Sequence, residues 1–232
     1  IAPNCQILDI SIDPAFVTPQ DIARGFNYAN QNSIDIINCS WGISMPSGSN
    51  SIIIEDAIND FIVNGRNGKG GVVVFAAGNN GQAVSYPGNT NEKIIVVGSI
   101  DNIGEREDYG IGDGSCYGTY LDFVAPGTGI FTTDYGNTYY PSFGRTSAAA
   151  PHMTGVVALM LSLDNTLSLD DVIKILEVST IKIRPDLYDY RMDDEYLINT
   201  GSSLHEVERD NDNAGWSQEV GWLQPRRSRL VT

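Results

Sequence analysis

GVVVFAAGNNG, residues 71–81, is the stretch that decides the fold of this chain. Its first half is continuously apolar and β-branched, without the alternating polar residues of a strand that has one face in water. Such a run is typical of a strand buried on both faces, and parallel sheets covered by helices bury their strands in this way. Its second half consists of small residues, glycine and asparagine, which predicts that the strand ends there in a turn.

The segments around this strand alternate between predicted helices and predicted strands. Amphipathic helices are expected at residues 18–32 and 51–63, where apolar side chains recur at helical spacing. Further strands are expected at residues 7–12, 34–42 and 93–100, and turns with short strands over 104–138. Strands separated by helices form βαβ units with right-handed crossovers. We therefore expect a three-layer α/β fold, with a mostly parallel sheet that carries helices on both faces and is incomplete at its amino end.

Composition and charge limit the classes of function. The 232 residues, 41% of them hydrophobic, suit one α/β domain with a sizeable core. The formal net charge of −15 argues against nucleic acid and against an anionic membrane as partners, because both would repel the chain. No run of about 18 apolar residues is present, so we expect no membrane span. Cys5, Cys39 and Cys116 are too widely spaced for a CxxC metal cluster, and Cys39 is expected to be a buried small hydrophobe.

A second informative segment is TSAAAPHMTGVVALMLSL, residues 146–163, which predicts a helix. The segment is apolar or small on nearly every side, so the helix belongs in the middle of the domain. Ser147 lies at its start, where unpaired amides and the positive end of the helix dipole favour a developing negative charge. A serine in this place is most often only an N-cap, so the segment alone leaves both interpretations open.

Five segments together resemble the subtilisin-like (subtilase) family of serine proteases. FGRTSAAAPHMTGVVALML resembles the nucleophile motif of that family, FAAGNNG its oxyanion segment, and INCSWG the strand beside its specificity cleft. YPGNTNEKIIVVGSID and DFVAPGTGIFTT match the two segments that connect these. All five occur in the order of the family, over residues 1–179.

The resemblance implies roles for individual residues. Ser147 would be the nucleophile, and its backbone N–H together with the Asn79 side-chain amide would form the oxyanion hole. The walls of the first substrate pocket would be Ser40, Trp41 and Gly42 on one side and Ala76, Ala77 and Gly78 on the other. The Tyr86–Pro87 bond corresponds to a peptide that is often cis in the family. Without the family context, Asn79 would be explained as part of a Gly-Asn turn that ends a strand.

The histidine that such a nucleophile needs does not precede Ser147. The triad order in subtilisin is Asp, His, Ser, so the resemblance implies that both partners lie outside this chain and that the chain alone is inactive or nearly so. His152 matches a structural histidine of the family's helix. His205 lies in a charged stretch that we expect to be solvated, and the chain lacks the Gly-x-Ser-x-Gly elbow of α/β-hydrolases.

Three features depart from the family pattern. Arg145 stands where the family usually has glycine before Thr-Ser, and a positive φ there would strain it. The chain opens on IAPNCQ without methionine or a signal peptide, which predicts a missing amino-terminal portion. We expect a partial catalytic domain at 1–200 and an acidic then basic tail at 201–232, where Pro225 and arginines replace an apolar closing helix. A truncated or frame-shifted gene product and a genuine pseudoenzyme both explain these ends.

The family resemblance implies a secreted or cell-envelope serine endopeptidase. Its partners would be a peptide or protein substrate and the missing amino-terminal segment. Trp41 would either give an extended peptide a flat apolar wall or pack in the core. The alternative function is a non-catalytic pseudoprotease that binds peptides. A Rossmann-like ligand-binding domain is disfavoured, because no GxGxxG follows the first strand.

The resemblance implies no obligatory cofactor, and we assign no metal-ligating residue. Calcium is a candidate ligand, because many subtilases bind it. The stretch from Asp210 to Gly215 begins like an EF-hand loop, but Gly221 stands where that loop needs a carboxylate, which favours a solvated loop. Asp101 and the residues from Asp108 to Asp113 are weaker alternatives.

Overall fold

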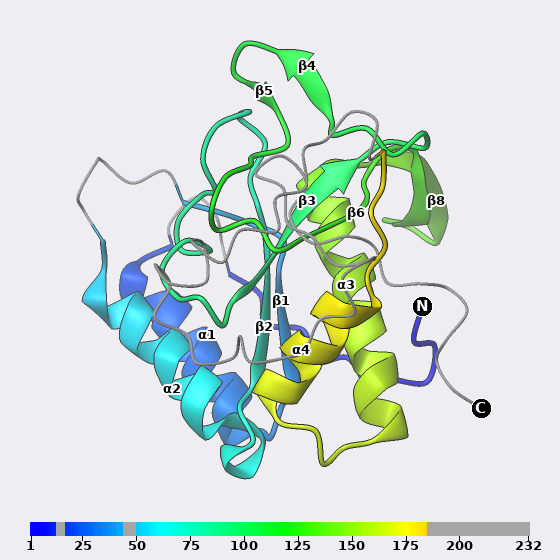
Figure 1. Cartoon of the computed structure of the whole chain (residues 1–232). Coiled ribbons are helices and arrows are strands. Elements are labelled where there is room, and N and C mark those ends of the chain that lie inside the picture. The colour runs from blue at the N-terminus through cyan, green and yellow to red at the C-terminus, as the bar shows by residue number, and fades with distance from the viewer. Residues whose placement is uncertain (13–16, 44–49, 185–232) are drawn as a thin grey trace.

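Strand β2 (Val72–Ala76) is the centre of the structure, a computed structural model that describes residues 1–12, 17–43 and 50–184 (Figure 1). Every residue of β2 is buried, as its continuous apolar run predicts. The strand pairs in parallel with β1 (Ile36–Cys39) and β3 (Ile95–Ile100), and β3 pairs in parallel with β6 (Phe123–Pro126). The resulting order in the sheet is β1-β2-β3-β6. The predicted parallel sheet is therefore confirmed.

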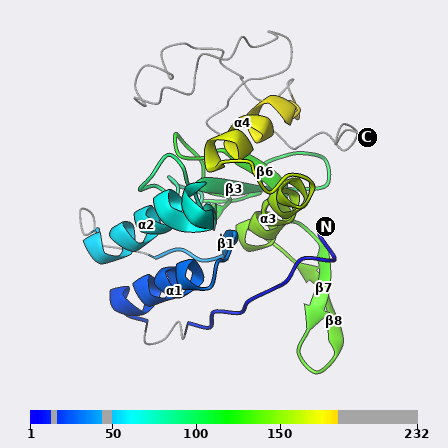
Figure 2. The ribbon, with the colours of Figure 1, turned by 90° about the horizontal axis from the view of Figure 1, so that it is seen from below.

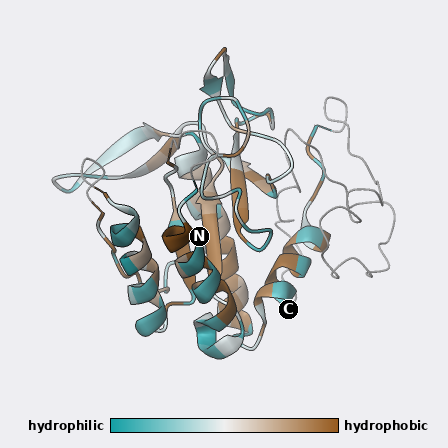
Figure 3. Ribbon diagram, turned by 90° about the vertical axis from the view of Figure 1, so that its left-hand side faces the viewer, coloured by the Kyte–Doolittle hydropathy of each residue, from teal (hydrophilic) through white to brown (hydrophobic). Residues whose placement is uncertain are grey.

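Helices cover both faces of this sheet. Helices α1 (Pro19–Gln31) and α2 (Ile52–Gly68) pack against each other on one face, and α3 (Thr146–Leu163) lies along the opposite face (Figure 2). Helix α4 (Leu169–Ser179) follows, and the Leu169 N–H donates to the carbonyl of Lys69 (2.8 Å). Hydrophobic residues gather on the strands and on α3, whereas the outer sides of α1 and α2 are hydrophilic (Figure 3). The three-layer α/β architecture is as expected.

Local sequence explains where the helices begin. Thr18 and Asp21 form a capping box, in which the Thr18 hydroxyl accepts from the Asp21 N–H (3.2 Å) and Asp21 Oδ2 accepts from the Thr18 N–H (2.9 Å). Ser168 and Asp171 form the same motif at the start of α4. Helix α2 continues beyond the expected end at residue 63, although its backbone around Arg66 is not helical. For α2, the start was therefore predicted more closely than the end.

Helix α3 owes its apolar composition to its place in the protein core. It contacts all four strands of the sheet. Its buried side chains include Met153, Val157 and Met160. Within the described part of the chain, it is the one helix that is long and apolar enough to cross a membrane by length and composition alone. Packing against the sheet accounts for that composition.

The strand predicted at residues 7–12 is not formed. This segment pairs with no other strand in the described residues. Ile10 and Ile12 pack against the core near Gly25 of α1, whereas Ile7 is 88% exposed. Alternation of apolar and polar residues determines which side chains face the core, but a strand also needs a neighbouring backbone for its hydrogen bonds. The prediction is wrong because helix α1, and not a strand, covers the apolar side chains.

Residues 104–138 form the expected turns and short strands. Strands β4 (Asp108–Gly110) and β5 (Asp113–Gly114) make one antiparallel pair. Strands β7 (Ile130–Asp134) and β8 (Thr138–Phe143) make another, which projects from the body of the protein (Figure 2). The domain boundary predicted between residues 200 and 201 lies outside the described residues.

Asp122 is a partly buried carboxyl group that connects β6 to β3. Its Oδ2 accepts from the Val96 N–H (2.7 Å), and its own N–H donates to the Val96 carbonyl (3.1 Å). Removal from water raises the pKa of Asp122 well above its usual range; the Val96 N–H opposes this shift and the charge of Glu177 adds to it. The folded protein therefore keeps this proton at pH values where the unfolded chain has lost it. Stability falls as the pH rises through that window, because the native state binds more protons.

Asp122→Asn should remove this pH dependence, because asparagine stays neutral and its oxygen can still accept from the Val96 N–H. The variant's free energy of unfolding relative to wild type should increase between about pH 4 and about pH 8, as measured by urea unfolding followed by circular dichroism. Asp56→Asn, which changes an exposed carboxylate on α2, is the control and should show no such trend. A constant difference between Asp122→Asn and wild type over this range would contradict the assignment.

Candidate active site

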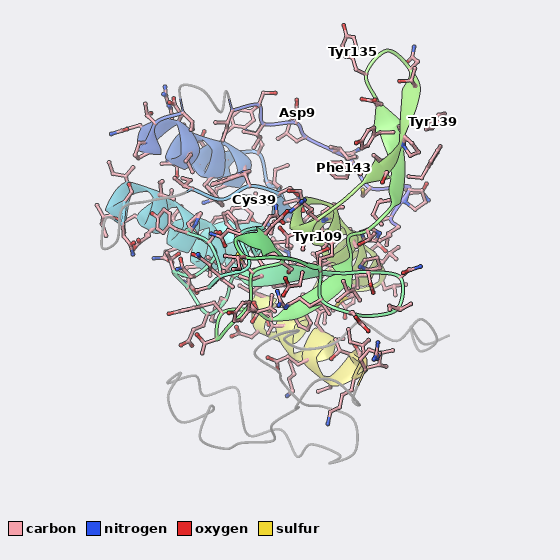
Figure 4. All side chains as sticks on the ribbon, turned by 90° about the horizontal axis from the view of Figure 1, so that it is seen from above. Asp9, Cys39, Tyr109, Tyr135, Tyr139 and Phe143 are labelled. Atoms are coloured by element: carbon pink, nitrogen blue, oxygen red, sulfur yellow. The ribbon has the colours of Figure 1, made fainter. Side chains whose placement is uncertain are left out.

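The carboxyl ends of β1 and β2 meet the amino end of α3 at one edge of the sheet. Figure 4 looks down on this edge from above, with Cys39 at the end of β1 labelled. Ser40 follows Cys39, and its hydroxyl donates to the carbonyl oxygen of Ser147 (3.0 Å). The Ser147 hydroxyl donates in turn to the carbonyl oxygen of Ser40 (3.2 Å). This reciprocal pair joins segments that lie 107 residues apart in the sequence.

Thr146 joins the end of β2 to the start of α3. Its backbone N–H and its hydroxyl both donate to Oδ1 of Asn79, at 3.1 Å and 2.7 Å. The Thr146 hydroxyl also accepts from the Gly78 N–H (3.3 Å). Thr146 is completely buried, so these bonds satisfy polar groups that water cannot reach. The sequence prediction did not include Thr146, although its place between Arg145 and Ser147 in the quoted motif was a usable signal.

Gly78 has a backbone conformation that only glycine adopts readily. Its φ is +108°, and a β-carbon added there would lie 2.2 Å from the Ser85 hydroxyl and 2.9 Å from the Cys116 sulfur. A β-carbon added at Gly42 would lie 3.0 Å from the β-carbon of Ser85. Ser85 therefore lies between the two predicted wall segments. The prediction missed it, although it directly precedes the quoted Tyr86–Pro87, whose peptide bond is cis as expected.

The wall residues differ in what they expose. Ser40 and Trp41 are partly exposed and Gly42 is exposed, whereas Ala76 and Ala77 are buried. Ala76 is 4% exposed and Ala77 is completely buried, so Gly78 is the partly exposed residue of the second predicted wall segment. The Trp41 ring packs edge-on against Phe75 of β2, with ring centres 5.1 Å apart and planes at 82°. Trp41 therefore packs on the core, which is one of its two predicted roles. It also keeps part of its surface open, as the other role, an apolar wall for a peptide, would require.

The other reactive side chains considered from the sequence are two histidines and Cys39. Nδ1 of His152 lies 2.7 Å from the Ala148 carbonyl, one turn earlier in the same helix. His205 lies outside the described residues. Burial raises the pKa of the Cys39 thiol, which keeps it protonated and unreactive, as its expected role as a small hydrophobe requires.

Metal-binding side chains are likewise not gathered. Among residues 1–12, 17–43 and 50–184, no three His, Cys, Asp or Glu side chains come together as a metal site. Oδ1 of Asp101 accepts from the N–H groups of Ile103 and Glu105, both at 2.9 Å. Asp108 and Asp113 form ion pairs with arginines. The Asp210 loop lies outside the described residues.

The comparison with protein families matches residues 1–222 to the subtilase family. A calcium-dependent protease of Trichormus variabilis is 34% identical over 224 residues, which cover 80% of this chain and 33% of that protein. A thermophilic serine proteinase of Bacillus sp. is 37% identical over 164 residues, covering 70% of this chain and 37% of that protein. Subtilisin DY of Bacillus licheniformis is 34% identical over 179 residues, with 74% and 60% covered. The chain thus spans only 33–37% of the first relatives it matches.

Solved structures have the same fold. A cold adapted subtilisin-like serine proteinase superimposes with a TM-score of 0.61 and 25% identity, covering 72% of this chain and 56% of that one. The self-cleaved protease domain of PatA superimposes with a TM-score of 0.59 and 28% identity, with 74% and 64% covered.

Gly78→Ala should lower the stability of the protein, because alanine at this position combines a strained φ with contact against Ser85 and Cys116. Gly118 is a matched control, since its φ is +107° and a β-carbon there would meet nothing within 4 Å. Gly118→Ala should cost about 1 kcal/mol and Gly78→Ala about 2–4 kcal/mol in urea unfolding. Equal losses in the two variants would show that the region around Gly78 is not closely packed.

Proposed function

We propose, since the chain belongs to the subtilase family, that it supplies the nucleophile part of a subtilisin-like serine endopeptidase. The match to the family extends over residues 1–222. Relatives named as a serine proteinase and a subtilisin support hydrolysis of peptide bonds as the reaction. Because the chain spans only 33–37% of the calcium-dependent protease and the thermophilic serine proteinase, the activity of the whole protein belongs to the proposal as well.

The observation that carries the proposal is the pair of hydrogen bonds between Asn79 and Thr146 at the start of α3. Both donors of Thr146 hold Oδ1 of Asn79, which leaves the Asn79 NH₂ group to donate to a substrate oxygen. Ser147 lies in the first turn of α3, where backbone N–H groups lack helical partners. These two donors would form the oxyanion hole, and the positive end of the helix would favour the charge that they bind.

The proposed reaction begins when Ser147 Oγ attacks the carbonyl carbon of the peptide bond. A C–O bond forms while the carbonyl electron pair moves onto the oxygen, which Asn79 and the Ser147 N–H stabilise. A base takes the hydroxyl proton and returns it to the leaving amine when the intermediate collapses and the C–N bond breaks. Water then hydrolyses the acyl-serine ester and restores the Ser147 hydroxyl. No histidine precedes Ser147, so we propose that the imidazole and its aspartate come from residues outside this chain. The chain alone would then be inactive or nearly so.

The proposed substrate is an extended peptide that lies along Ser40, Trp41 and Gly42. Ser85, between Gly42 and Gly78, would form the floor of the first pocket. Its hydroxyl is uncharged, and the residues that follow Asn79 are Asn-Gly-Gln, which supply no carboxylate. We therefore expect no preference for a basic side chain in this pocket.

Calcium binding and the location of the protein are also part of the proposal, although we assign no residues to either. Relatives from Trichormus variabilis and from a Nostoc species are named calcium-dependent proteases, which supports calcium as a ligand to be tested. The described residues provide no cluster of carboxylates for it, so we assign it no site and no step. We propose a location outside the cell or in its envelope, because the family resemblance implies one.

The second candidate function is a pseudoprotease that binds peptides without cleaving them. The observation that favours it is the hydrogen bond from the Ser147 hydroxyl to the carbonyl of Ser40, since no imidazole holds this hydroxyl in the described residues. A serine in this state keeps its proton and is a weak nucleophile. The same cleft would then serve recognition alone.

A fluorophosphonate probe separates the two functions when it is applied to the protein expressed from its natural gene. The protease function predicts covalent labelling at Ser147, identified by peptide mass spectrometry, because the probe reacts with activated serines. Ser147→Ala should abolish the label, and Ser162→Ala, at the far end of α3, should not. Binding of extended peptides without any labelling would favour the pseudoprotease.

Asn79→Ala should lower kcat by about 10²–10³-fold with little change in KM, the loss known for the corresponding donor of subtilisin. The reason is that the amide meets an oxygen that becomes negative only in the transition state. Asn64→Ala is the control and should leave kcat unchanged, because Asn64 is an exposed side chain on α2 that donates to Asp60. A rise in KM at constant kcat would place Asn79 in substrate binding and not in the oxyanion hole.

A further inference from the structure

Arg145 directly precedes Thr146 and Ser147 and has an unusual backbone conformation. Its φ is 68° and its ψ is −169°, a region that glycine occupies almost alone. The strain anticipated for a positive φ at this position is therefore present. A residue other than glycine keeps such a conformation only where the surrounding structure holds it there.

The guanidinium group of Arg145 is bound by both strands of the β4–β5 hairpin. Its two terminal nitrogens donate to the two carboxylate oxygens of Asp113 in β5, the second at 3.3 Å. Its central carbon lies 5.1 Å from the centre of the Tyr109 ring in β4. A planar guanidinium group suits both contacts, since its fork matches a carboxylate and its face stacks on an aromatic ring. Figure 1 shows the β4–β5 hairpin at the top of the molecule.

The same hairpin holds the backbone of Asn79. The N–H of Gly114, next to Asp113, donates to the Asn79 carbonyl (3.1 Å), and the Gly114 carbonyl accepts from the Gly81 N–H (2.9 Å). The side chain of Asn79 is meanwhile bonded to Thr146, which follows Arg145. Contacts therefore run from Arg145 through Asp113, Gly114 and Asn79 to Thr146. The peptide bond between Arg145 and Thr146 closes this ring.

A second set of contacts fixes Arg145 from the other side. Its backbone N–H donates to the Gly127 carbonyl (2.6 Å). The buried carboxylate of Glu107 accepts from the Tyr109 hydroxyl (3.1 Å) and from the hydroxyl of Thr128, the residue after Gly127. The ring over which Arg145 lies is thus tied to the loop that binds the Arg145 backbone.

We propose that Arg145 and Asp113 are positioning residues, which fix the Asn79 segment and the start of α3 relative to each other before any substrate binds. We call the contacts that join Arg145 through Asp113, Gly114 and Asn79 to Thr146 the clamp. Its role in catalysis rests on the proposed function, in which Asn79 and Ser147 provide the two oxyanion donors. Donors that are already in place need no rearrangement when charge develops, so the clamp acts on the transition state more than on substrate binding. Arg145 takes the place of the glycine usual in the family and gains this contact in exchange for backbone strain.

The first test needs no activity and uses the chain itself. Amide hydrogen exchange followed by NMR should become at least about 10-fold faster at Gly114, Arg145 and Thr146 together in Asp113→Asn, which removes the charge but keeps the shape. Asp108→Asn is the matched control. Asp108 lies in the same hairpin and pairs with Arg106, and its side chain is 53% exposed against 46% for Asp113. In the control, the same amides should stay within about 3-fold of wild type.

Arg145→Gly provides a second variant in case Asp113→Asn folds poorly. Glycine adopts the backbone conformation of position 145 without strain, but it lacks the guanidinium group. The Gly114 and Thr146 amides should again exchange faster, while the thermal midpoint should be no lower than that of Asp113→Asn. Wild-type exchange at these amides in Asp113→Asn, or equal acceleration in Asp108→Asn, would overturn the clamp.

The second test measures peptide hydrolysis by the protein expressed from its natural gene. Asp113→Asn should lower kcat about 10-fold and leave KM within about 2-fold, a division that a general loss of stability would not produce. Asp108→Asn should leave both constants unchanged. A raised KM with unchanged kcat would overturn the positioning role. Absence of turnover in the wild-type protein would instead contradict the proposed function, and the exchange experiment would still decide whether the clamp exists.

Discussion

Burial of β2 on both faces is the constraint on which the rest of the structure depends. All five residues of this strand are buried, so it needs a neighbouring strand on each side and a helical layer on each face. The layer on one side consists of α1 and α2, and the apolar helix α3 supplies the other. Because the sheet is parallel, the ends of β1 and β2 lie at the same edge, where α3 begins. The fold thereby brings Ser40, Asn79 and Ser147 together.

Hydrogen bonds of buried groups then determine the details of this edge. Thr146 is completely buried, and its hydroxyl donates to Asn79 and accepts from the N–H of Gly78. Losing either partner would leave a polar group unpaired in the interior, which costs more than the bond itself contributes. The same logic extends to the Glu107 carboxylate, which is buried but accepts from three hydroxyl groups. The proposed oxyanion site would therefore owe part of its preformed geometry to the need to satisfy these buried groups.

Elements whose information is local were predictable. The continuous apolar run of β2, the all-round apolar face of α3 and the capping residue Thr18 each indicate their structure without reference to distant residues. The strand expected at residues 7–12 was wrong, because pairing requires a neighbour that the alternation of Ile10 and Ile12 cannot reveal. Thr146 and Ser85 were missed for the same reason, since their importance lies in contacts with Asn79 and Gly78.

The sequence by itself determined the parallel α/β class, the family resemblance and the candidates Ser147 and Asn79, because repeated apolar patterns and short motifs are properties of neighbouring residues. Only the tertiary structure decided how these candidates are held. It bonded the Ser147 hydroxyl to Ser40, fixed Asn79 through Thr146, and placed Arg145 on Asp113 of a separate hairpin. The physical reason is that each of these contacts joins segments far apart in the chain, and such contacts depend on how the layers pack. No pattern of neighbouring residues encodes them.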